Sequence, residues 1–497
     1  MNFPFGIIIL ILSIIGYWLS WRSFSMQKKY FAVFLLVFIG LILRVYLASD
    51  FYLHSWDERY HALVAKNMLG HPFIPTLYEN PIFPYLPEDW SGNHIWLHKQ
   101  PMSLWTIALS FSCFGTNEIA LRLPSILMST FGIFATYKVA RHFFSAQVGF
   151  IATFLFSING LIIELTSGRV ATDHIDITFM FFILLGVWMA LEFGKRKKVI
   201  FNVLCGVFIG AAILTKWLPG LIVIPIWIGA MRYYRSFSTK YYVLHFLLLL
   251  SVIAVVALPW QMYIHYAFPQ EAIWEAQYNR KHLTSALEGQ SAPFYYYFEK
   301  VRLIFGEMML LALAFLAIVS WKKRKNPKFW IFAIWIFIPI VFFSFAATKM
   351  QGYIMIAAPA IFIIGAYYWE YLKWNKHKLK FKWLASIIMV LIIALPIRYT
   401  IERLKPFDQS ERNPAWVVQL KQLGQETTGQ NGILLNTSHP IEAMFYTNLT
   451  AYERLPDQDV LDSLIDRGYS IYINDGENVS SAILDNNNYR IVSIDER

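Results

Sequence analysis

The chain has 497 residues, of which 57% are hydrophobic and 15% are charged, and its mean hydropathy is +0.44. Soluble proteins hold about 45–50% apolar and about 25% charged residues, so this composition excludes an ordinary soluble protein and predicts an integral membrane protein. The two cysteines, Cys113 and Cys205, lie far apart in apolar surroundings, which argues against a disulfide framework, a thiol active site or a zinc site.

The net charge of +11 is unevenly distributed along the chain. The residues after Thr400 include 15 acidic and 8 basic side chains, so they carry −7, and residues 1–400 carry +18. The basic excess lies in short loops between apolar runs, where it reports membrane topology and contact with anionic headgroups. We therefore expect membrane lipids as partners and no nucleic acid.

The first apolar run, residues 3–21, predicts a retained helix, because it has no basic segment before it and is too long for a signal-peptide core. Arg22, Lys28 and Lys29 follow it and mark a cytoplasmic turn. The second run, 30–48, then exits to the outside. The acidic pair Asp57-Glu58 comes directly after this exit, so we expect it outside the cytoplasm.

Residues 49–119 are of mixed composition, and five prolines between positions 72 and 87 interrupt regular structure. The apolar stretch 104–114 is too short to span a bilayer, so we expect helices that lie in the membrane interface. With the first two runs, the later ones make about twelve predicted transmembrane helices: 120–140, 147–166, 172–192, 199–214, 217–231, 241–264, 302–320, 329–347, 353–371 and 382–399.

The alternation of these helices agrees with the charges of the loops, since every second loop is basic. Lysine and arginine clusters fall in the loops near positions 138–141, 195–198, 232–240, 322–328 and 373–382. The intervening loops hold mostly single cations, and these loops are predicted to lie on the outer side: Lys99, Arg169, Lys216, Arg280 and Lys349.

The composition after Thr400 changes to that of a soluble domain. Residues 432–436 and 469–474 are predicted strands, and 441–445 and 460–466 are predicted helices. The sequence thus predicts a transmembrane domain, 1–400, followed by a small extracytoplasmic α/β domain, 401–497.

Ionisable residues near the membrane need an explanation, since burial of one at the bilayer centre costs at least about 2.5–3.5 kcal/mol. In this chain they collect on the predicted outer side, where a carboxylate pair and several cations recur. Such a set suits an anionic ligand whose reaction also requires a base. The residues are Asp57, Glu58, Lys99, Arg122, Arg169, Asp173, Asp176, Lys216, Arg280, Lys349 and Tyr353.

Lysine and arginine bind phosphate through charge-assisted hydrogen bonds, which makes Lys99, Arg280 and Lys349 candidates for a phosphate site. The alternative for each is an interfacial cation that reaches toward lipid headgroups.

Arg122 and Lys216 are better explained as structural anchors. Asp173 and Asp176 follow Arg169 closely, so either an internal ion pair or support of the carboxylate site explains them. The histidines show no H-E-x-x-H or similar ligand spacing, so no metal site is predicted, and a requirement for a divalent metal stays open.

Several motifs, taken in order, resemble those of the GT-C type membrane glycosyltransferases that include protein mannosyltransferases and lipid A aminoarabinose transferases. The resemblance covers about residues 30–400, and each motif falls in a predicted outer loop or at a helix end. The motifs are Trp56-Asp57-Glu58-Arg59-Tyr60, His98-Lys99-Gln100-Pro101 with Trp105, Arg122-Leu123-Pro124-Ser125, Thr215-Lys216 with Pro219, Leu258-Pro259-Trp260, Tyr278-Asn279-Arg280 leading to Pro293-Phe294-Tyr295-Tyr296, and Thr348-Lys349 leading to Tyr353.

This resemblance implies a GT-C fold, a sugar donor on a polyprenyl phosphate and an inverting transfer. It assigns Asp57 as the general base with Glu58 beside it, and the donor phosphate to Lys99, Arg280, Lys349 and Tyr353. Tyr60, Arg122, Arg169 and Asp173 are expected to support these residues. Gln100 departs from the pattern, where the family usually has a second proline, and so does Trp217-Leu218, where Gly or Pro is usual.

The leading hypothesis is therefore a glycosyltransferase that uses a polyprenyl-phosphate sugar, with undecaprenyl phosphate as the carrier in a bacterium. Transfer to lipid A or another envelope glycolipid at the outer face of the inner membrane is favoured, and a protein serine or threonine is the alternative acceptor. A transporter or lipid flippase is the alternative from another class, although the internal repeats typical of such folds are not visible. An assembly scaffold with an acidic outer domain is a third hypothesis.

Overall fold

The computed structural model describes residues 3–235, 238–378, 380–408, 411–475, 479–484 and 486–494. The chain divides into two compact units. The first, called here the membrane unit, comprises Met1–Ala48, Lys99–Ser103 and Arg122–Gln409. The second, called here the α/β unit, comprises Ser49–His98, Leu104–Leu121 and Ser410–Arg497.

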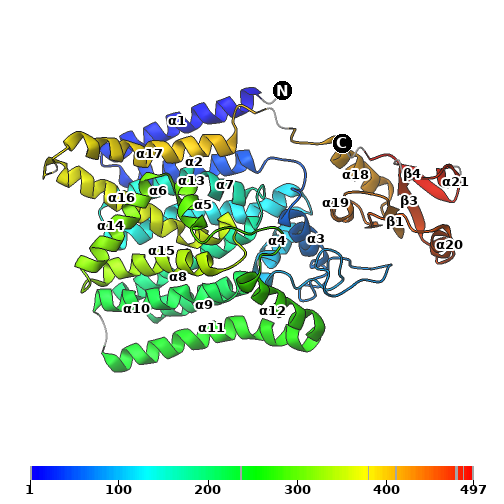
Figure 1. Ribbon diagram of the computed structural model, residues 1–497, viewed down its shortest axis with the longest axis horizontal. Helices are drawn as coiled ribbons and strands as arrows, with labels where there is room; N and C mark the ends of the chain where they lie inside the picture. The colour runs from blue at the N-terminus through cyan, green and yellow to red at the C-terminus, as the bar shows by residue number, and fades with distance from the viewer. Residues whose placement is uncertain are drawn as a thin grey trace. The chain divides into compact units, whose positions relative to one another are not determined.

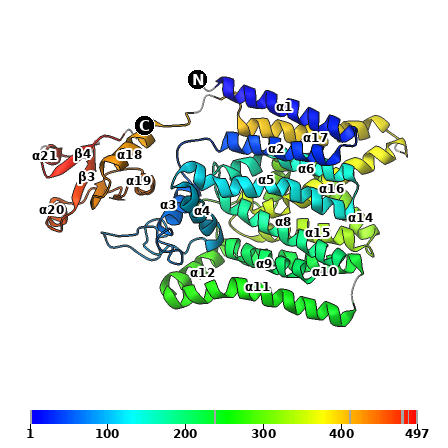
Figure 2. The same ribbon diagram turned by 180° about the vertical axis from the view of Figure 1, so that it is seen from behind.

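The membrane unit is built from helices, most of which lie nearly side by side (Figures 1 and 2). Two further helices, α4 (Pro101–Phe114) and α5 (Glu118–Phe143), have residues in both units. The helices of the membrane unit are α1 (Phe3–Ser25), α2 (Lys29–Leu47), α6 (Ala146–Ile158), α7 (Gly160–Thr166), α8 (Asp173–Arg196), α9 (Val199–Lys216), η1 (Leu218–Ile222), α10 (Val223–Tyr234), α11 (Thr239–Ala267), α12 (Pro269–Thr284), α13 (Tyr296–Phe305), α14 (Met308–Lys322), α15 (Pro327–Phe345), η2 (Gln351–Ala357), α16 (Ala358–Asn375), η3 (Lys376–Lys378) and α17 (Lys382–Leu404).

Each of the twelve predicted apolar runs coincides with one helix or with two consecutive helices. The run 120–140 lies on α5, and the other runs lie on helices of the membrane unit. Within the described residues, nine helices are long and apolar enough to cross a membrane, or eleven if each of two bent pairs forms one span. The remaining run coincides with the shorter apolar helix Leu218–Tyr234. The chain is therefore a multi-pass membrane protein.

Small residues let neighbouring helices of the membrane unit approach closely. Gly206 and Gly210 lie four residues apart on α9, and a Cβ on them would come within 2.8 Å and 2.6 Å of Val252 and Val256 on α11. Such small-x-x-x-small pairs favour helix packing in lipid, where burial of apolar surface supplies little driving force. Both views show α9 and α11 side by side (Figures 1 and 2).

One sharp bend of the membrane unit lies between α13 and α14, which meet at 117°. Gly306 ends α13 with a φ of +92°, a backbone conformation that favours glycine because a Cβ is strained there. The apolar run that the sequence predicts as one helix, 302–320, is thus two helices that meet at this glycine.

The α/β unit holds a four-stranded parallel sheet with strand order β2-β1-β3-β4. The predicted α/β module is confirmed, and the strands at 432–436 and 469–474 correspond to β1 and β3. The sequence did not predict β2 and β4, which are two and four residues long. The elements are α3 (Asp57–Asn67), α18 (Ala415–Glu426), β1 (Gly432–Leu435), α19 (Pro440–Tyr446), β2 (Thr450–Ala451), α20 (Gln458–Asp466), β3 (Ser470–Asn474), α21 (Ser481–Leu484) and β4 (Tyr489–Val492).

A shared hydrophobic core joins the first predicted outer loop to residues 410–497, called here the C-terminal segment. Leu63 and Val64 of α3 pack in one cluster with Leu420 of α18 and Leu434 of β1. Residues 49–98 therefore belong to the same compact unit as residues after 409. The sequence predicted two domains that follow each other along the chain, with a boundary at residue 400. Each compact unit of the structure instead combines segments that lie far apart in sequence.

Candidate active site

The acidic pair opens α3, and the two carboxylates have different surroundings. Asp57 is the first residue of the helix and is partly exposed, and a carboxylate is favoured there by the helix dipole. Glu58 is 0% exposed. Its Oε2 accepts a hydrogen bond from the backbone N–H of His54 at 2.8 Å and lies 2.6 Å from His54 Nδ1. Asp57 is thus the accessible member of the pair.

Tyr60 lies one turn further along α3 and is buried. Its ring packs edge-on against Trp90, with centroids 5.1 Å apart, and the Arg59 guanidinium lies 5.1 Å from the ring. Burial raises the pKa of the Tyr60 hydroxyl. These contacts make Tyr60 a packing residue of α3.

Lys349 lies in the membrane unit, in the short segment between α15 and η2. Its side chain is 6% exposed, and Nζ donates one hydrogen bond, 2.6 Å long, to the carbonyl oxygen of Ala346. Within the described part of the chain, no carboxylate oxygen lies within ion-pair distance of this ammonium. An ammonium can donate three hydrogen bonds, so two remain available for a ligand.

The segment that carries Lys349 is paired with the loop that follows α12, the helix of Arg280. The backbone N–H of Thr348 donates to the carbonyl of His282, and that of Lys349 donates to the carbonyl of Gln290, both at 3.0 Å. Thr348 also forms an antiparallel bridge with Ser291. Arg280 itself is exposed on the last part of α12. Tertiary pairing thus joins two candidate phosphate-binding motifs that lie about seventy residues apart in sequence.

Tyr353 lies beside an ion pair that the sequence did not predict. Lys216, at the end of α9, forms an ion pair with Asp176 of α8, and its Nζ lies 4.5 Å from the centre of the Tyr353 ring. Thr172 donates its hydroxyl to the same Asp176 carboxylate. The Asp176 carboxylate of α8 is therefore the counter-ion of Lys216 on α9.

Gly352 is the position at which this group is packed most tightly. A Cβ there would overlap both the Asp176 carboxylate and the Thr172 hydroxyl. In the same group, Thr172 and the neighbouring Asp173 both have positive φ, +70° and +27°. Positive φ in a β-branched residue is a genuine outlier, and such strain gathers at functional sites. A glycine directly before Tyr353 is the one signal in the sequence that pointed to this packing.

The remaining candidates have structural contacts of their own. Arg122 is fully buried, and its guanidinium donates to the carbonyl of Ala48 at 3.0 Å, at the end of α2. Asp173 is buried at the first position of α8, and Arg169 is half-buried in the turn before it.

Lys99 is half-buried directly before α4. The residue after it, Gln100, accepts a hydrogen bond from Gln261 of α11 at 2.7 Å. An amide side chain at position 100 therefore ties the Lys99 segment to α11, which a proline there would not do.

The structure thus distributes the predicted residues between the two units. Asp57, Glu58 and Tyr60 belong to the α/β unit. The membrane unit holds Lys99, Arg122, Arg169, Asp173, Arg280, Lys349 and Tyr353. Within the described ranges, no group of three or more His, Cys, Asp or Glu side chains has the arrangement of a metal site.

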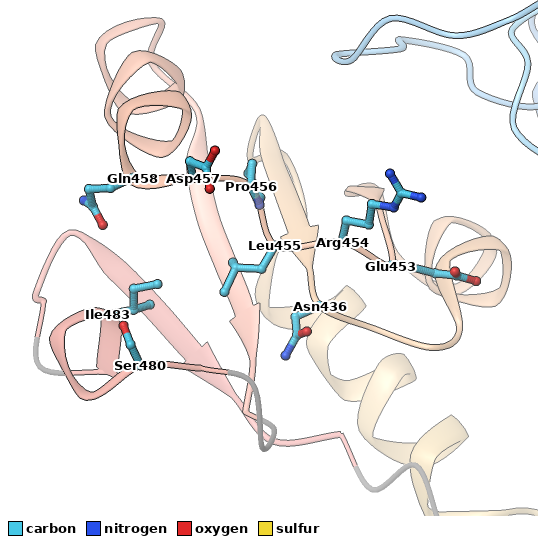
Figure 3. A pocket seen from close by; sticks show the side chains of 9 residues that line it. All are labelled: Asn436, Glu453, Arg454, Leu455, Pro456, Asp457, Gln458, Ser480 and Ile483. Carbon is cyan, nitrogen blue, oxygen red and sulfur yellow. The ribbon is translucent and has the colours of Figure 1, made fainter.

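A cavity of about 640 Å³ lies in the α/β unit, where several strands end (Figure 3). Asn436 follows β1, and Leu455 lies in the loop between β2 and α20; the side chain of Leu455 points toward that of Ile483 in α21, and Asn436 also lines the cavity. Ligands of open parallel sheets often bind at the carboxyl ends of the strands. None of the predicted site residues lines this cavity.

Known proteins resemble the chain in both sequence and fold. Residues 98–260 match the family model of dolichyl-phosphate-mannose-protein mannosyltransferases. The undecaprenyl phosphate-alpha-4-amino-4-deoxy-L-arabinose arabinosyl transferase 1 of Pseudomonas fluorescens (strain Pf0-1) is 26% identical over 290 residues, which are 54% of this chain and 48% of the relative. The match thus spans about half the length of that enzyme.

Among solved structures, ArnT from Cupriavidus metallidurans bound to undecaprenyl phosphate superposes with a TM-score of 0.57 at 16% identity, covering 90% of this chain and 86% of ArnT. The chain has a GT-C type fold. The archaeal oligosaccharyltransferase AglB from Archaeoglobus fulgidus, in complex with an inhibitory peptide and a dolichol-phosphate, has a TM-score of 0.56 at 12% identity and covers 86% of this chain and 65% of AglB. The predicted resemblance to protein mannosyltransferases and lipid A aminoarabinose transferases is confirmed.

Proposed function

We propose that this GT-C chain is an inverting glycosyltransferase that takes its sugar from a polyprenyl phosphate, with undecaprenyl phosphate as the carrier. The observation that carries the proposal is the Lys349 ammonium, which is buried in the membrane unit and contacts a single carbonyl. A buried charge is costly unless an opposite charge compensates it. A phosphate headgroup supplies that charge, and the ligand-bound ArnT structure carries such a lipid.

In the proposed reaction, the bond between the anomeric carbon and the phosphate oxygen breaks while a bond to the acceptor oxygen forms on the opposite face of the sugar. One displacement of this kind inverts the anomeric centre. The phosphodiester leaves as a phosphomonoester, so one negative charge develops on it. Fixed cations that stabilise this developing charge lower the barrier.

We assign the phosphate-binding role to four residues, each with a reason. Lys349 is buried without a carboxylate partner, and Arg280 ends the helix whose following loop pairs with the Lys349 segment. Tyr353 offers a hydroxyl from η2, which directly follows that segment, and Lys99 is a cation of the same unit. Arg169 and Asp173 are proposed to support this region through the turn before α8, and Arg122 does so through the end of α2.

Asp57 is proposed as the general base, because it is the accessible carboxylate of the acidic pair. With a hydroxyl acceptor, Asp57 takes the proton as the new bond forms. With a phosphate acceptor such as that of lipid A, the nucleophile is already ionised, and Asp57 orients it instead. Buried Glu58 is proposed to assist by holding the start of α3 through His54.

The favoured acceptor is lipid A or another envelope glycolipid, at the outer face of the inner membrane, because the named sequence relative is an aminoarabinose transferase. A protein acceptor is the second candidate, because residues 98–260 match the protein mannosyltransferase model. We propose that the loop of Asp57 and the segment after residue 400 both lie on the extracytoplasmic side. The alternation of basic loops supports this orientation.

The test is a transfer assay with purified protein in lipid nanodiscs and radiolabelled undecaprenyl-phosphate sugars as donors. Lipid A and envelope proteins are supplied as acceptors in separate reactions, and mass spectrometry reads the product and its anomeric configuration. We expect label to move to one acceptor class with inversion. Absence of transfer from every polyprenyl donor, with intact folded protein, would reject the proposal.

A further inference from the structure

The helix that begins with Asp57 contacts the C-terminal segment at points along its whole length. α3 has 11 residues and is therefore about 16 Å long. Its neighbours include α19, which follows β1 of the parallel sheet. Three sets of polar contacts join this segment to α3 and to the residues directly before it: one before the start of the helix, one in its first turn and one at its end.

The first set reaches the start of α3 through Arg412. The backbone N–H of Phe51 donates to the Arg412 carbonyl at 2.7 Å, and the Arg412 guanidinium lies 3.6 Å from Asp50 Oδ1. Asp50 Oδ2 in turn lies 3.1 Å from Nε2 of His54, the residue whose other ring nitrogen contacts Glu58. A chain of buried polar groups thus leads from Arg412 to the residue next to Asp57.

The second set is an ion pair in the first turns of the helix. Arg59 Nη1 lies 3.2 Å from Oε1 and 3.5 Å from Oε2 of Glu442, a residue of α19. Glu442 is only 2% exposed, so this pair is weakly screened by solvent and is a directional contact. Arg59 lies two residues after Asp57, so Glu442 fixes the rotation of the helix about its axis.

The third set lies at the end of α3, where Lys66 caps α19. Its Nζ donates to the carbonyl oxygens of Met444, Phe445 and Thr447 at 2.8, 2.9 and 2.9 Å. The last carbonyls of a helix have no partner within it, and a cation is favoured at that end. Burial lowers the pKa of Lys66 to about 8, so at neutral pH the side chain is still mainly the ammonium.

We propose that the C-terminal segment is a positioning element for Asp57, and that Arg412, Glu442 and the end of α19 hold α3 in the orientation that the transfer reaction requires. This inference rests on the proposed role of Asp57 as base. A base acts only within hydrogen-bond reach of its proton, so small displacements of its helix lower the rate steeply. Arg59, Lys66, Glu442 and Arg412 are positioning residues in this scheme.

The test compares Glu442→Gln, Arg59→Gln and the charge-reversed pair R59E/E442R in the full-length protein. Each single variant is expected to lower kcat about tenfold or more, because misplacement of about 1 Å can cost as much as a hundredfold. KM for the undecaprenyl-phosphate donor stays within about twofold, since the proposed phosphate-binding residues are unchanged. The reversed pair is expected to regain part of kcat.

Hydrogen exchange measured by mass spectrometry provides a readout that does not depend on activity. Faster exchange is expected in 57–67 of the single variants, with β1 and β3 unchanged. If Glu442→Gln also loosens the sheet, Arg59→Gln is the deciding variant, because it leaves the buried carboxylate next to His439. Glu402→Gln is the matched control, since it removes an exposed ion pair with Arg398 and is expected to change neither reading.

Asp57→Asn, assayed in parallel, distinguishes failure of the proposed base role of Asp57 from failure of the proposed positioning role of the C-terminal segment. Full turnover by Asp57→Asn would reject the base role itself. If Asp57→Asn is inactive while both single variants keep wild-type kcat and wild-type exchange in α3, the positioning role is wrong and the base role stands. Slow turnover together with raised KM and unchanged exchange would also overturn the positioning role, because it would indicate a contact with substrate.

Discussion

Two buried or partly buried lysines, one in each unit, show how the same side chain can serve different purposes. Lys66 of α3 donates to three carbonyl oxygens, which is as many acceptors as an ammonium can use. Lys349 donates to one and has no carboxylate partner in the described residues, although it is 6% exposed. The protein itself satisfies the first ammonium, whereas the second donates only one hydrogen bond among the described residues, which is why we propose it as the anion-binding lysine.

Lys216 completes the comparison, because it is a membrane-unit lysine that does have a carboxylate. Its pairing with Asp176 is the contact expected of a structural anchor, whereas Lys349 is the better candidate for the donor phosphate. We therefore expect the number of protein partners, more than burial alone, to separate a structural cation from one that binds a ligand.

The largest expected effect is that of Lys349→Met. Loss of one charged donor to the leaving phosphate is expected to lower kcat by about 100- to 1,000-fold. The thermal stability of the ligand-free protein stays the same or rises, because a buried charge without a carboxylate partner is removed. Transfer assays measure kcat, and thermal unfolding measures the stability. Lys325→Met, at an exposed position, is the control and is expected to change neither quantity. Wild-type transfer by Lys349→Met would remove the distinction between the two lysines.

Asp57→Asn is expected to lower kcat about 100-fold or more with a hydroxyl acceptor, since general-base catalysis contributes about 10²- to 10⁴-fold. The amide cannot take the proton, while binding of undecaprenyl phosphate, read as a rise in unfolding temperature, is retained. Asp466→Asn on the exposed face of α20 is the control. If donor binding is lost along with turnover, Asp57 contributes to donor binding instead.

Gly352→Ala is expected to lower transfer about tenfold, because its Cβ displaces the Asp176 carboxylate that holds Lys216 beside Tyr353. Overpacking of this kind typically costs about 1–3 kcal/mol, so the unfolding temperature falls as well. Gly70→Ala, where a Cβ would meet the carbonyl oxygen of Asn67 at an ordinary contact distance of 4.0 Å, is the control and is expected to change neither quantity. Wild-type transfer by Gly352→Ala would show that the position of the Asp176 carboxylate does not influence the role of Tyr353 in the reaction.

Lys66→Met is expected to have its main effect on stability. It leaves three carbonyl oxygens at the end of α19 without their donor, at a cost of about 1–3 kcal/mol. Faster proteolysis of the α/β unit and a lower unfolding temperature measure this loss, which is opposite in direction to the expected result for Lys349→Met. Equal stability losses in the two variants would contradict the comparison between the lysines.

Much of the fold could be predicted from local patterns. Apolar runs predicted the long apolar helices and the bent pairs of the membrane unit because a bilayer requires about 20 apolar residues per span, whereas the polar helix α12 was not predicted. The bend at Gly306 was missed, because an apolar run indicates that a segment lies in the membrane and does not show where its helix bends. β2 was missed because a strand of two residues leaves almost no periodicity to read, and β4 was missed although it is as long as the predicted β1.

The candidate site was predicted only in part, for a similar reason. Motif resemblance singled out Asp57, Lys349 and Tyr353, yet the cation beside the Tyr353 ring, Lys216, is distant in sequence. Asp176 was expected to pair with Arg169, seven residues away, or to support the carboxylate site, and it pairs with Lys216 instead. Glu58 was expected beside Asp57 as part of the chemistry, and the contacts of His54 place it in a buried polar chain.

The sequence by itself determined that this protein lies in a membrane, because composition and the length of apolar runs reflect the solvent that surrounds each helix. It also determined which residue types are available for phosphate binding and for base chemistry. Only the tertiary structure decided which cations are already satisfied and which segment holds α3. Those answers depend on contacts between residues such as Arg59 and Glu442, which lie 383 positions apart and come together only when the chain folds.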